Sequence, residues 1–232
     1  MKNLNNTYKK KDIIFSRGVS HEGYSFFKYF LKKNTDIKSF LDIGCGNGIL
    51  KKLIDNKSNY LGVDANAGIY KKKKSNDIKY FKNAQKTEDY LKNLNKKYEC
   101  VMLMDVLEHT DSFLKLFKIA LNKSSKYVVV GLPNEDYIIA RLRFLFGKGI
   151  LTHGLEMINT KPGHKHQWFI QYKVALPLIE NFANKNKFKL SEKFFYINQP
   201  SNFFKRIIYK LAIILIPKTI MMNNFCLIFK KN

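Results

Sequence analysis

Short apolar runs alternate with longer amphipathic stretches along most of this chain. Segments 39–44, 60–65, 78–84, 100–106 and 127–133 are short and apolar, which predicts buried strands. Apolar residues at helical spacing predict helices over 23–33, 49–55, 87–97, 111–123 and 174–187. Thr110 or Asp111 is the expected cap of the fourth helix. This alternation predicts an α/β fold with a parallel, doubly wound sheet.

The C-terminal third is less regular. We expect Pro177 to break the helix over 174–187, and we expect two final strands over 189–198 and 224–231. The apolar segment Lys205 to Lys218 is flanked by lysines, which favours an amphipathic helix packed on those strands. The alternative is peripheral contact of residues 205–218 with a membrane.

Length and cysteine usage limit the class of protein. The chain has 232 residues, enough for a single domain over 1–232. Its N-terminus has no apolar leader, and no apolar run reaches transmembrane length. Cys45, Cys100 and Cys226 are widely separated and odd in number, which argues against a disulfide framework. These features predict a cytoplasmic location.

The formal charge of +24 raises the possibility of a nucleic-acid partner. Arginine, the preferred side chain for bidentate phosphate and base contacts, occurs only four times. Asparagine, isoleucine, phenylalanine and tyrosine are also abundant, as in proteins encoded by AT-rich genes. A solvated basic surface is therefore favoured over an RNA-binding face, which stays possible.

The segment FLDIGCGNG, residues 40–48, follows the first long helix and ends in glycines at every second position. In open α/β sheets, ligands bind beyond the carboxyl ends of the strands. Glycines permit a tight turn that lets a ligand approach the backbone, and the N–H groups that follow suit an anion. The spacing G-x-G-x-G differs from the dinucleotide fingerprint because position 49 is Ile.

Two carboxylates complete this pattern. Asp42 precedes the turn and suits a ligand that carries an ammonium group. Asp64 ends the second strand about 20 residues downstream, where an acidic side chain accepts the hydroxyls of a ribose. An amino acid joined to a ribose describes S-adenosylmethionine (SAM).

The motifs LDIGCGNG, GVDAN and MDVLEH, in this order and spacing, resemble those of class I SAM-dependent methyltransferases. The similarity is closest to the small-molecule group that includes the ubiquinone-biosynthesis O-methyltransferases. Residues after Pro133 resemble methyltransferases of bacterial surface-polysaccharide clusters. The resemblance implies a Rossmann-like seven-stranded sheet, mostly parallel with an antiparallel last strand. It also implies an N-terminal helical segment over 1–36 and a substrate-side insertion over about 134–170.

The resemblance also implies the cofactor-binding residues. It places Asp42 and the turn around the methionine part of SAM, Asp64 on the ribose, and Asn83 near the adenine. The full set is Asp42, Gly44, Cys45, Gly46, Asn47, Gly48, Asp64, Ala65, Asn83, Asp105 and Val106. Purely structural roles compete at some positions: Cys45 as a turn residue, Asn83 as a loop residue, and Asp64 or Asp105 as a helix cap.

Methylation of a hydroxyl needs a base, and the histidines are the candidates. His164 and His166 alternate in GHKHQWF and are the first candidates, with His109 of DVLEH next. Two histidines could hold a metal, but the sequence shows no third ligand, so we expect no metal site. Trp168 and Phe169 are expected in the core.

These features predict a methyltransferase that O-methylates a small molecule or glycan. The first alternative is an RNA methyltransferase, although no nucleobase-methylating motif follows the fourth strand. The second is a SAM-binding accessory subunit without turnover. The sequence leaves the oligomeric state open.

Overall fold

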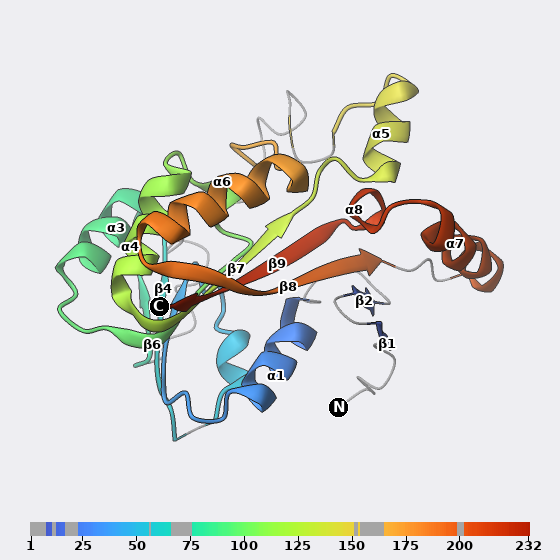
Figure 1. The fold of residues 1–232 in the computed structure, drawn as a ribbon. Helices are drawn as coiled ribbons and strands as arrows, with labels where there is room; N and C mark the ends of the chain where they lie inside the picture. Colours follow the sequence, from blue (N-terminus) through green and yellow to red (C-terminus); the bar gives the residue numbers. More distant parts are fainter. Residues whose placement is uncertain are drawn as a thin grey trace.

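A single mixed sheet forms the centre of the molecule, and helices cover both of its faces (Figure 1). The computed structural model describes residues 8–10, 13–16, 23–55, 57–65, 76–150, 153, 165–198 and 202–232. The sheet order is β1-β2-β8-β9-β7-β6-β3-β4-β5. Its strands are β1 Tyr8–Lys10, β2 Ile13–Ser16, β3 Ser39–Ile43, β4 Asn59–Asp64, β5 Ile78–Tyr80, β6 Tyr98–Met104, β7 Ser124–Pro133, β8 Phe188–Asn198 and β9 Asn224–Lys231.

The expected seven-stranded sheet is confirmed over β3 to β9. Neighbouring strands β5, β4, β3, β6 and β7 are all parallel. The last strand, β9, is antiparallel to both of its neighbours, β7 and β8. The carboxyl ends of β3, β4 and β6 therefore meet at one edge, where the candidate cofactor residues lie.

Two short strands extend the sheet beyond the expected seven. Strand β2 pairs in parallel with β8, and β1 pairs antiparallel with β2. Among the described residues of the expected helical segment over 1–36, α1, Gly23–Lys33, is helical, whereas 8–10 and 13–16 are strands. The β-branched and aromatic residues of Ile13 to Phe15 favour a strand, and the edge of β8 offers it a partner.

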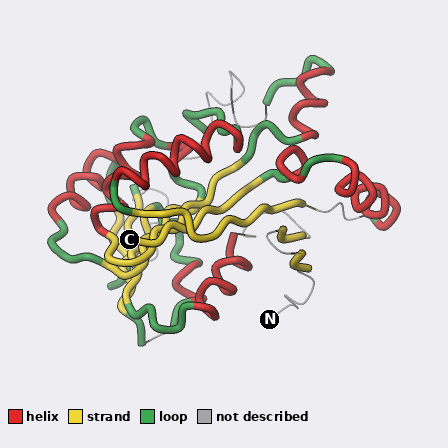
Figure 2. Tube along the Cα trace, in the orientation of Figure 1, coloured by secondary structure: helices red, strands yellow, loops and turns green. Residues whose placement is uncertain are grey.

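Each face of the sheet carries its own apolar core. On one face, α1 packs Phe26, Phe27 and Phe30 against the sheet with the 3₁₀ helix η1, Leu50–Leu53. On the other face lie α3 (Ala84–Asn93), α4 (Phe113–Lys123) and α6 (Tyr172–Lys185) (Figure 2). The helix expected over 49–55 is thus only the short η1.

Two expected helix features differ in the structure. Helix α6 continues through Pro177, because Ala175, Ile179 and Ala183 bury one side of it against the sheet. The N-cap of α4 is Ser112, whose side chain makes no capping bond. The expected cap Thr110 instead donates its hydroxyl to the carbonyl of Leu107 at 2.9 Å, in the preceding turn.

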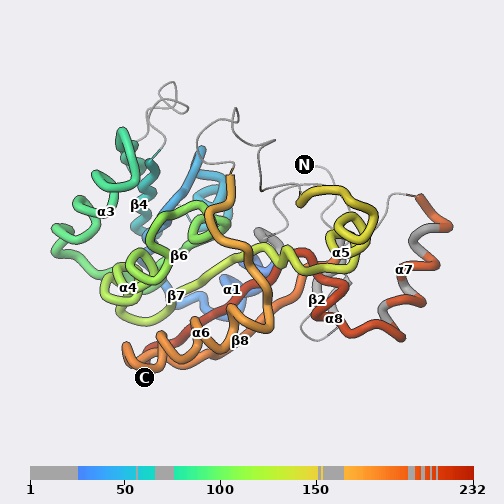
Figure 3. The backbone as a smooth tube through the Cα atoms, turned by 90° about the horizontal axis from the view of Figure 1, so that it is seen from above, coloured from blue at the N-terminus to red at the C-terminus, as the bar shows by residue number. Residues whose placement is uncertain are grey.

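Helices α5 (Ile138–Leu145) and α7 (Phe203–Leu215) lie at the end of the molecule opposite α3 (Figure 3). A short helix, α8 (Lys218–Met221), joins α7 to β9. Tyr209 and Ala212 of α7 pack against the apolar core, whereas other side chains of α7 are exposed: Ile214 is 78 % and Leu215 84 % exposed. Within the described residues, no helix is long and apolar enough to cross a membrane.

Candidate functional site

The turn after β3 has the backbone conformation that its glycines permit. Gly44, Gly46 and Gly48 have φ values of 74°, 53° and 73°. These lie in the left-handed region, which side chains with a Cβ rarely adopt. A Cβ on Gly44 would also stand 2.3 Å from Cγ2 of Val106. Val106, at the end of β6, therefore packs directly on the turn.

Hydrogen bonds tie this turn to the neighbouring strands. The N–H of Gly46 donates to Oδ2 of Asp64 at 2.8 Å, and the hydroxyl of Tyr80 donates to the carbonyl of Gly46 at 3.1 Å. The N–H of Gly44 donates to the carbonyl of Val63 at 2.7 Å. The carboxylate expected to bind the ribose is thus held beside the turn expected to bind the methionine part.

Asp42 is a buried carboxylate at the centre of this edge. Its side chain is 1 % exposed, and Oδ2 accepts a hydrogen bond from the hydroxyl of Tyr60 at 2.7 Å. Burial raises the pKa of Asp42 to about 7, against the lowering effect of Tyr60, with the charge of Asp64 adding to the rise. A ligand ammonium beside Asp42 would favour its ionised form.

Other expected cofactor residues take up different roles. Cys45 is buried against Gly62, and burial raises the pKa of its thiol, as expected of a turn residue rather than a nucleophile. Asn83 caps α3, because its side chain accepts the N–H of Lys86 at 3.0 Å. That bond supports the structural role for Asn83. The side chain is also exposed after β5, at the edge of the sheet where the candidate cofactor residues lie.

The remaining expected cofactor residues lie at the same edge of the sheet. Asn47 is exposed at the tip of the turn, and Ala65 follows β4 half-buried. Asp105 is exposed with φ of 54°, and its N–H donates to the carbonyl of Gly131 at 3.2 Å. Left-handed backbone at a residue with a side chain is a strained feature that concentrates at functional sites. The left-handed conformation of Asp105 directs the chain from β6 into η2, Leu107–His109.

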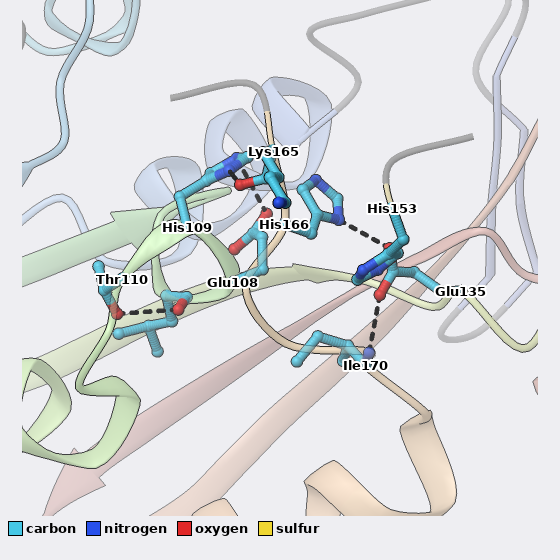
Figure 4. A network of polar contacts seen from close by, with 9 residues as sticks. Glu108, His109, Thr110, Glu135, His153, Lys165, His166 and Ile170 are labelled. Atoms are coloured by element: carbon cyan, nitrogen blue, oxygen red, sulfur yellow. Dashed lines mark hydrogen bonds and ion pairs between the residues drawn. The ribbon is translucent and has the colours of Figure 1, made fainter. Parts of the chain in front are cut away.

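Beyond β6 and β7, histidines and glutamates gather into a second cluster (Figure 4). His166 Nδ1 lies 2.7 Å and His153 Nε2 lies 2.8 Å from the same oxygen, Oε1 of Glu135. The other oxygen of Glu135 accepts the N–H of Ile170 at 2.8 Å. The ring of His109 lies 4.7 Å from that of His166. Of the expected bases, the structure therefore brings His109 and His166 together, and His164 lies outside the described residues.

Glu108 is the most buried member of this second cluster. It is 1 % exposed, and its Oε2 has no hydrogen-bond partner. Burial, with the nearby carboxylate of Asp105, raises the pKa of Glu108 well above its usual range. Its backbone carbonyl accepts the N–H of Gln167 at 2.7 Å, which joins η2 to the segment that carries His166.

Sequence reasoning missed Glu108, Glu135 and His153 as site residues. Glu135 lies two residues after β7 and Glu108 lies in η2 shortly after β6, so their positions beyond strand ends were an available signal. Nothing in the spacing indicated that both would face His166, because Glu135 and His166 lie near opposite ends of the expected insertion and Glu108 lies before it.

Trp168 and Phe169 were expected in the core, but they are 44 % and 45 % exposed. The indole N–H of Trp168 donates to the carbonyl of Thr110 at 2.6 Å, which holds the ring at the surface. Both rings line an apolar pocket of about 490 Å³ between the start of α4 and α6. The expected cofactor residues do not line this pocket.

Comparisons with known proteins bear on the family of the chain and on its fold. A family model described as "Methyltransferase domain" matches residues 17–177. No curated protein matches the chain in sequence.

Solved structures share the fold at low sequence identity. A SAM-dependent methyltransferase from Archaeoglobus fulgidus is 20 % identical with a TM-score of 0.58, covering 89 % of this chain and 94 % of its own. The magnesium protoporphyrin IX methyltransferase of Synechocystis PCC 6803 with bound SAH is 13 % identical with a TM-score of 0.55, covering 91 % and 83 %. A plantazolicin methyltransferase in complex with a triazolic analog and SAH is 14 % identical with a TM-score of 0.56, covering 90 % and 82 %.

Proposed function

This chain belongs to the methyltransferase-domain family and uses SAM as its methyl donor, and we propose that it methylates a hydroxyl oxygen of a small molecule or glycan. The residues around the β3 turn suit the donor: a glycine cradle, the Asp42 carboxylate and the Asp64 carboxylate. SAM supplies a methyl group that is already activated, so the protein mainly has to align the acceptor and remove its proton.

The second cluster is the observation that carries the choice of an oxygen acceptor. Val106 packs on Gly44 of the cofactor turn, and η2 with His109 begins at the next residue. His166 stands beside His109, and the carboxylate of Glu135 orients it. Histidines held by carboxylates next to a methyl donor suit an acceptor that must lose a proton before it reacts.

The test uses SAM with a labelled methyl group, the purified protein and a fractionated extract of the host. We expect label in a small-molecule, lipid or glycan fraction, in a bond with the stability of a methyl ether. His166→Ala should remove most of the label while SAM affinity stays within about threefold, since His166 acts on the acceptor. Lys165→Ala is the matched control, because its side chain is exposed and only its backbone carbonyl contacts His109.

Two other outcomes would replace this proposal. Label in RNA that depends on His166 would make the basic surface an RNA-binding face, with binding that weakens steeply as salt rises. SAM binding without label in any fraction, together with copurification of a partner enzyme, would indicate an accessory subunit.

We further infer that the apolar surface of α5 and α7 rests on an anionic lipid surface, where the acceptor is lipid-linked. Phe144, Leu145 and Phe146 at the end of α5 are 72 to 75 % exposed, and Phe204 and Ile208 of α7 are 74 % and 66 % exposed. Both helices lie at one end of the molecule (Figures 1 and 3). The net charge of +24 complements anionic headgroups.

Sedimentation with lipid vesicles tests this contact. The protein should bind phosphatidylglycerol vesicles and release at high salt, and it should bind phosphatidylcholine weakly. Ile214→Asp with Leu215→Asp should weaken binding by about tenfold or more, because it places charges on the apolar face. Val174→Asp, at a 61 % exposed position on α6, should have no effect. Equal binding by the wild type, the Ile214→Asp/Leu215→Asp variant and Val174→Asp would exclude α7 as the contact with the vesicles.

A further inference from the structure

Three side chains of the second cluster, from two separate segments of the chain, converge. Glu108 and His109 belong to η2, and His166 precedes α6. Their ligand-forming atoms all lie within 4.8 Å of one another. Figure 4 shows His166 between Glu108 and His109 on one side and Glu135 and His153 on the other.

The hydrogen bonds of the two imidazoles fix which nitrogen carries the proton. Nδ1 of His166 lies 2.7 Å from the carboxylate of Glu135, and Nδ1 of His109 lies 3.0 Å from the carbonyl of Lys165. Both partners can only accept, so each neutral ring has its proton on Nδ1. Each ring therefore keeps its lone pair on Nε2. A donor bond on one nitrogen that presents the other is the usual arrangement of histidines that bind metals.

Glu108 provides an independent observation. Its carboxylate is 1 % exposed, Oε2 has no hydrogen-bond partner, and Oε1 lies 3.9 Å from Nε2 of His109. A carboxyl oxygen that is buried without a hydrogen-bond partner costs free energy in either protonation state. A cation bound between Glu108 and the two Nε2 atoms would supply the missing partner.

Two further hydrogen bonds hold the segments together independently of these three side chains. The N–H of Gln167 donates to the carbonyl of Glu108 at 2.7 Å, and the indole of Trp168 donates to the carbonyl of Thr110 at 2.6 Å. The three ligand-forming side chains therefore stand on a connected backbone, as a site for an ion requires.

We propose that Glu108, His109 and His166 bind a divalent transition-metal ion through one carboxylate oxygen and two imidazole Nε2 atoms. Two nitrogens and one oxygen suit Zn²⁺ and related ions better than Mg²⁺, which prefers oxygen ligands. Three protein ligands leave a coordination position open for an acceptor oxygen. Glu135 is a positioning residue in this arrangement, because it acts through His166.

The role of the ion in methyl transfer rests on the proposed function, whereas its binding does not. The ion would lower the pKa of an acceptor hydroxyl bound to it, and the hydroxyl would lose its proton to water. The oxygen lone pair then forms the bond to the methyl carbon, and the sulfur of SAM keeps the electron pair of the broken C–S bond. The two histidines are then ligands, so no free imidazole is needed as the base.

Direct titration of the metal tests the site without any methylation assay. The full chain, stripped with a chelator, is titrated with Zn²⁺ against a chromogenic competitor, and we expect one strongly bound ion per chain. Glu108→Gln, His109→Ala and His166→Ala should each weaken binding by about 100-fold or more. Glu135→Gln should weaken it by about tenfold, as the loss of an outer partner does. Co²⁺ in place of Zn²⁺ should show visible absorption typical of nitrogen and oxygen ligands.

His153→Ala is the matched control, because His153 contacts Glu135 on the side away from Glu108 and should leave affinity within about threefold. Thermal melting and SAM calorimetry verify that each variant folds. Loss of Zn²⁺ binding in His153→Ala but not in Glu108→Gln or His109→Ala would overturn the assignment and place the ion at Glu135. Failure to bind Zn²⁺, Co²⁺ or Mn²⁺ with SAM binding intact would overturn the metal site and leave His166 as the base. Tight Zn²⁺ binding by a protein that transfers no label to any fraction of the extract would contradict the proposed function and leave the metal site standing.

Discussion

Two regions are held together in different ways: the edge of the sheet expected to bind SAM (the cofactor edge), and the second cluster of histidines and glutamates, which we propose faces the acceptor (the acceptor cluster). At the cofactor edge, glycine backbone, strand ends and short bonds such as Gly46 to Asp64 set the geometry. In the acceptor cluster, side chains from η2, from just after β7 and from the segment before α6 meet through hydrogen-bonding contacts, with Glu135 facing two histidines. Backbone geometry therefore determines the first site, and ionisable side chains determine the second.

This difference predicts how each site responds to change. Substitution at the cofactor edge should alter backbone conformation, folding stability and SAM affinity together. Substitution in the acceptor cluster should alter turnover while SAM affinity and folding stay close to those of the wild type. Each prediction below tests one side of that contrast.

The largest effect is expected for Asp64→Ala. It removes the carboxylate expected to accept both ribose hydroxyls, so SAM affinity should fall by roughly 100-fold or more in calorimetry. Asp64→Asn keeps an acceptor for the N–H of Gly46, so it separates ligand loss from distortion of the turn. Asp89→Ala, at an exposed carboxylate on α3, is the control. Unchanged affinity in Asp64→Ala would remove Asp64 from the cofactor site.

Gly44→Ala should lower the free energy of unfolding by about 3 kcal/mol. Part of this cost comes from φ of 74°, and part from the contact of 2.3 Å between a new Cβ and Val106. Gly147→Ala is the matched control: its φ is 68° with nothing within 4 Å, so only about 1 kcal/mol is expected.

Chemical unfolding in a double-mutant cycle separates the cost of backbone strain at position 44 from the cost of the contact with Val106. In a Val106→Ala background, Gly44→Ala should cost about 1 to 2 kcal/mol, because the contacts with the two Cγ atoms are gone and only Cβ of residue 106, at 3.2 Å, remains close. An equal cost in both backgrounds would show that the close approach of Val106 does not restrict position 44.

On the acceptor side, Glu135→Gln should lower turnover by about 30-fold with SAM affinity unchanged. The amide loses the charge that orients His166 and His153, but it still accepts the N–H of Ile170. Turnover is measured on the fraction that gains label from SAM. A parallel loss of SAM affinity would contradict the separation of the two sites.

The two sites also differ in how far the sequence could reveal them. Asp42, the turn at 44–48 and Asp64 each lie at or directly after a strand end, so strand prediction and parallel order place them together. His166 meets Glu135 across 31 residues, and His109 meets Lys165 across 56. Contacts of that separation depend on the path of the insertion, which local periodicity does not determine. The same limit explains the misplacement of Trp168 and Phe169, whose apolar character predicted burial.

The sequence also could not predict two features at the far end of the sheet, which are the strands β1 and β2 and the exposed face of α7. Periodicity identified α7 as amphipathic, but it could not indicate whether protein or another surface covers its apolar side. Pairing of β2 with β8 depends on an edge that only the folded sheet provides.

The smallest effect concerns Asp42 and is a pH dependence. Burial raises the pKa of Asp42 to about 7, from 3.8 for an exposed carboxyl, so the folded state binds its proton more tightly than the unfolded state does. Stability is therefore lost as pH rises between these two values. Asp42→Asn removes that loss, because the amide has no charge to desolvate.

Denaturant unfolding without SAM, at pH 5.5 and pH 7, measures this effect. The stability advantage of Asp42→Asn over the wild type should grow by about 1.5 kcal/mol between the two pH values. Saturating SAM should shrink the difference, since the ligand ammonium favours the ionised carboxylate and the amide cannot pair with it. A constant advantage across pH would mean that Asp42 titrates normally in the fold, and the cofactor edge would then hold a hydrated carboxylate rather than a buried one.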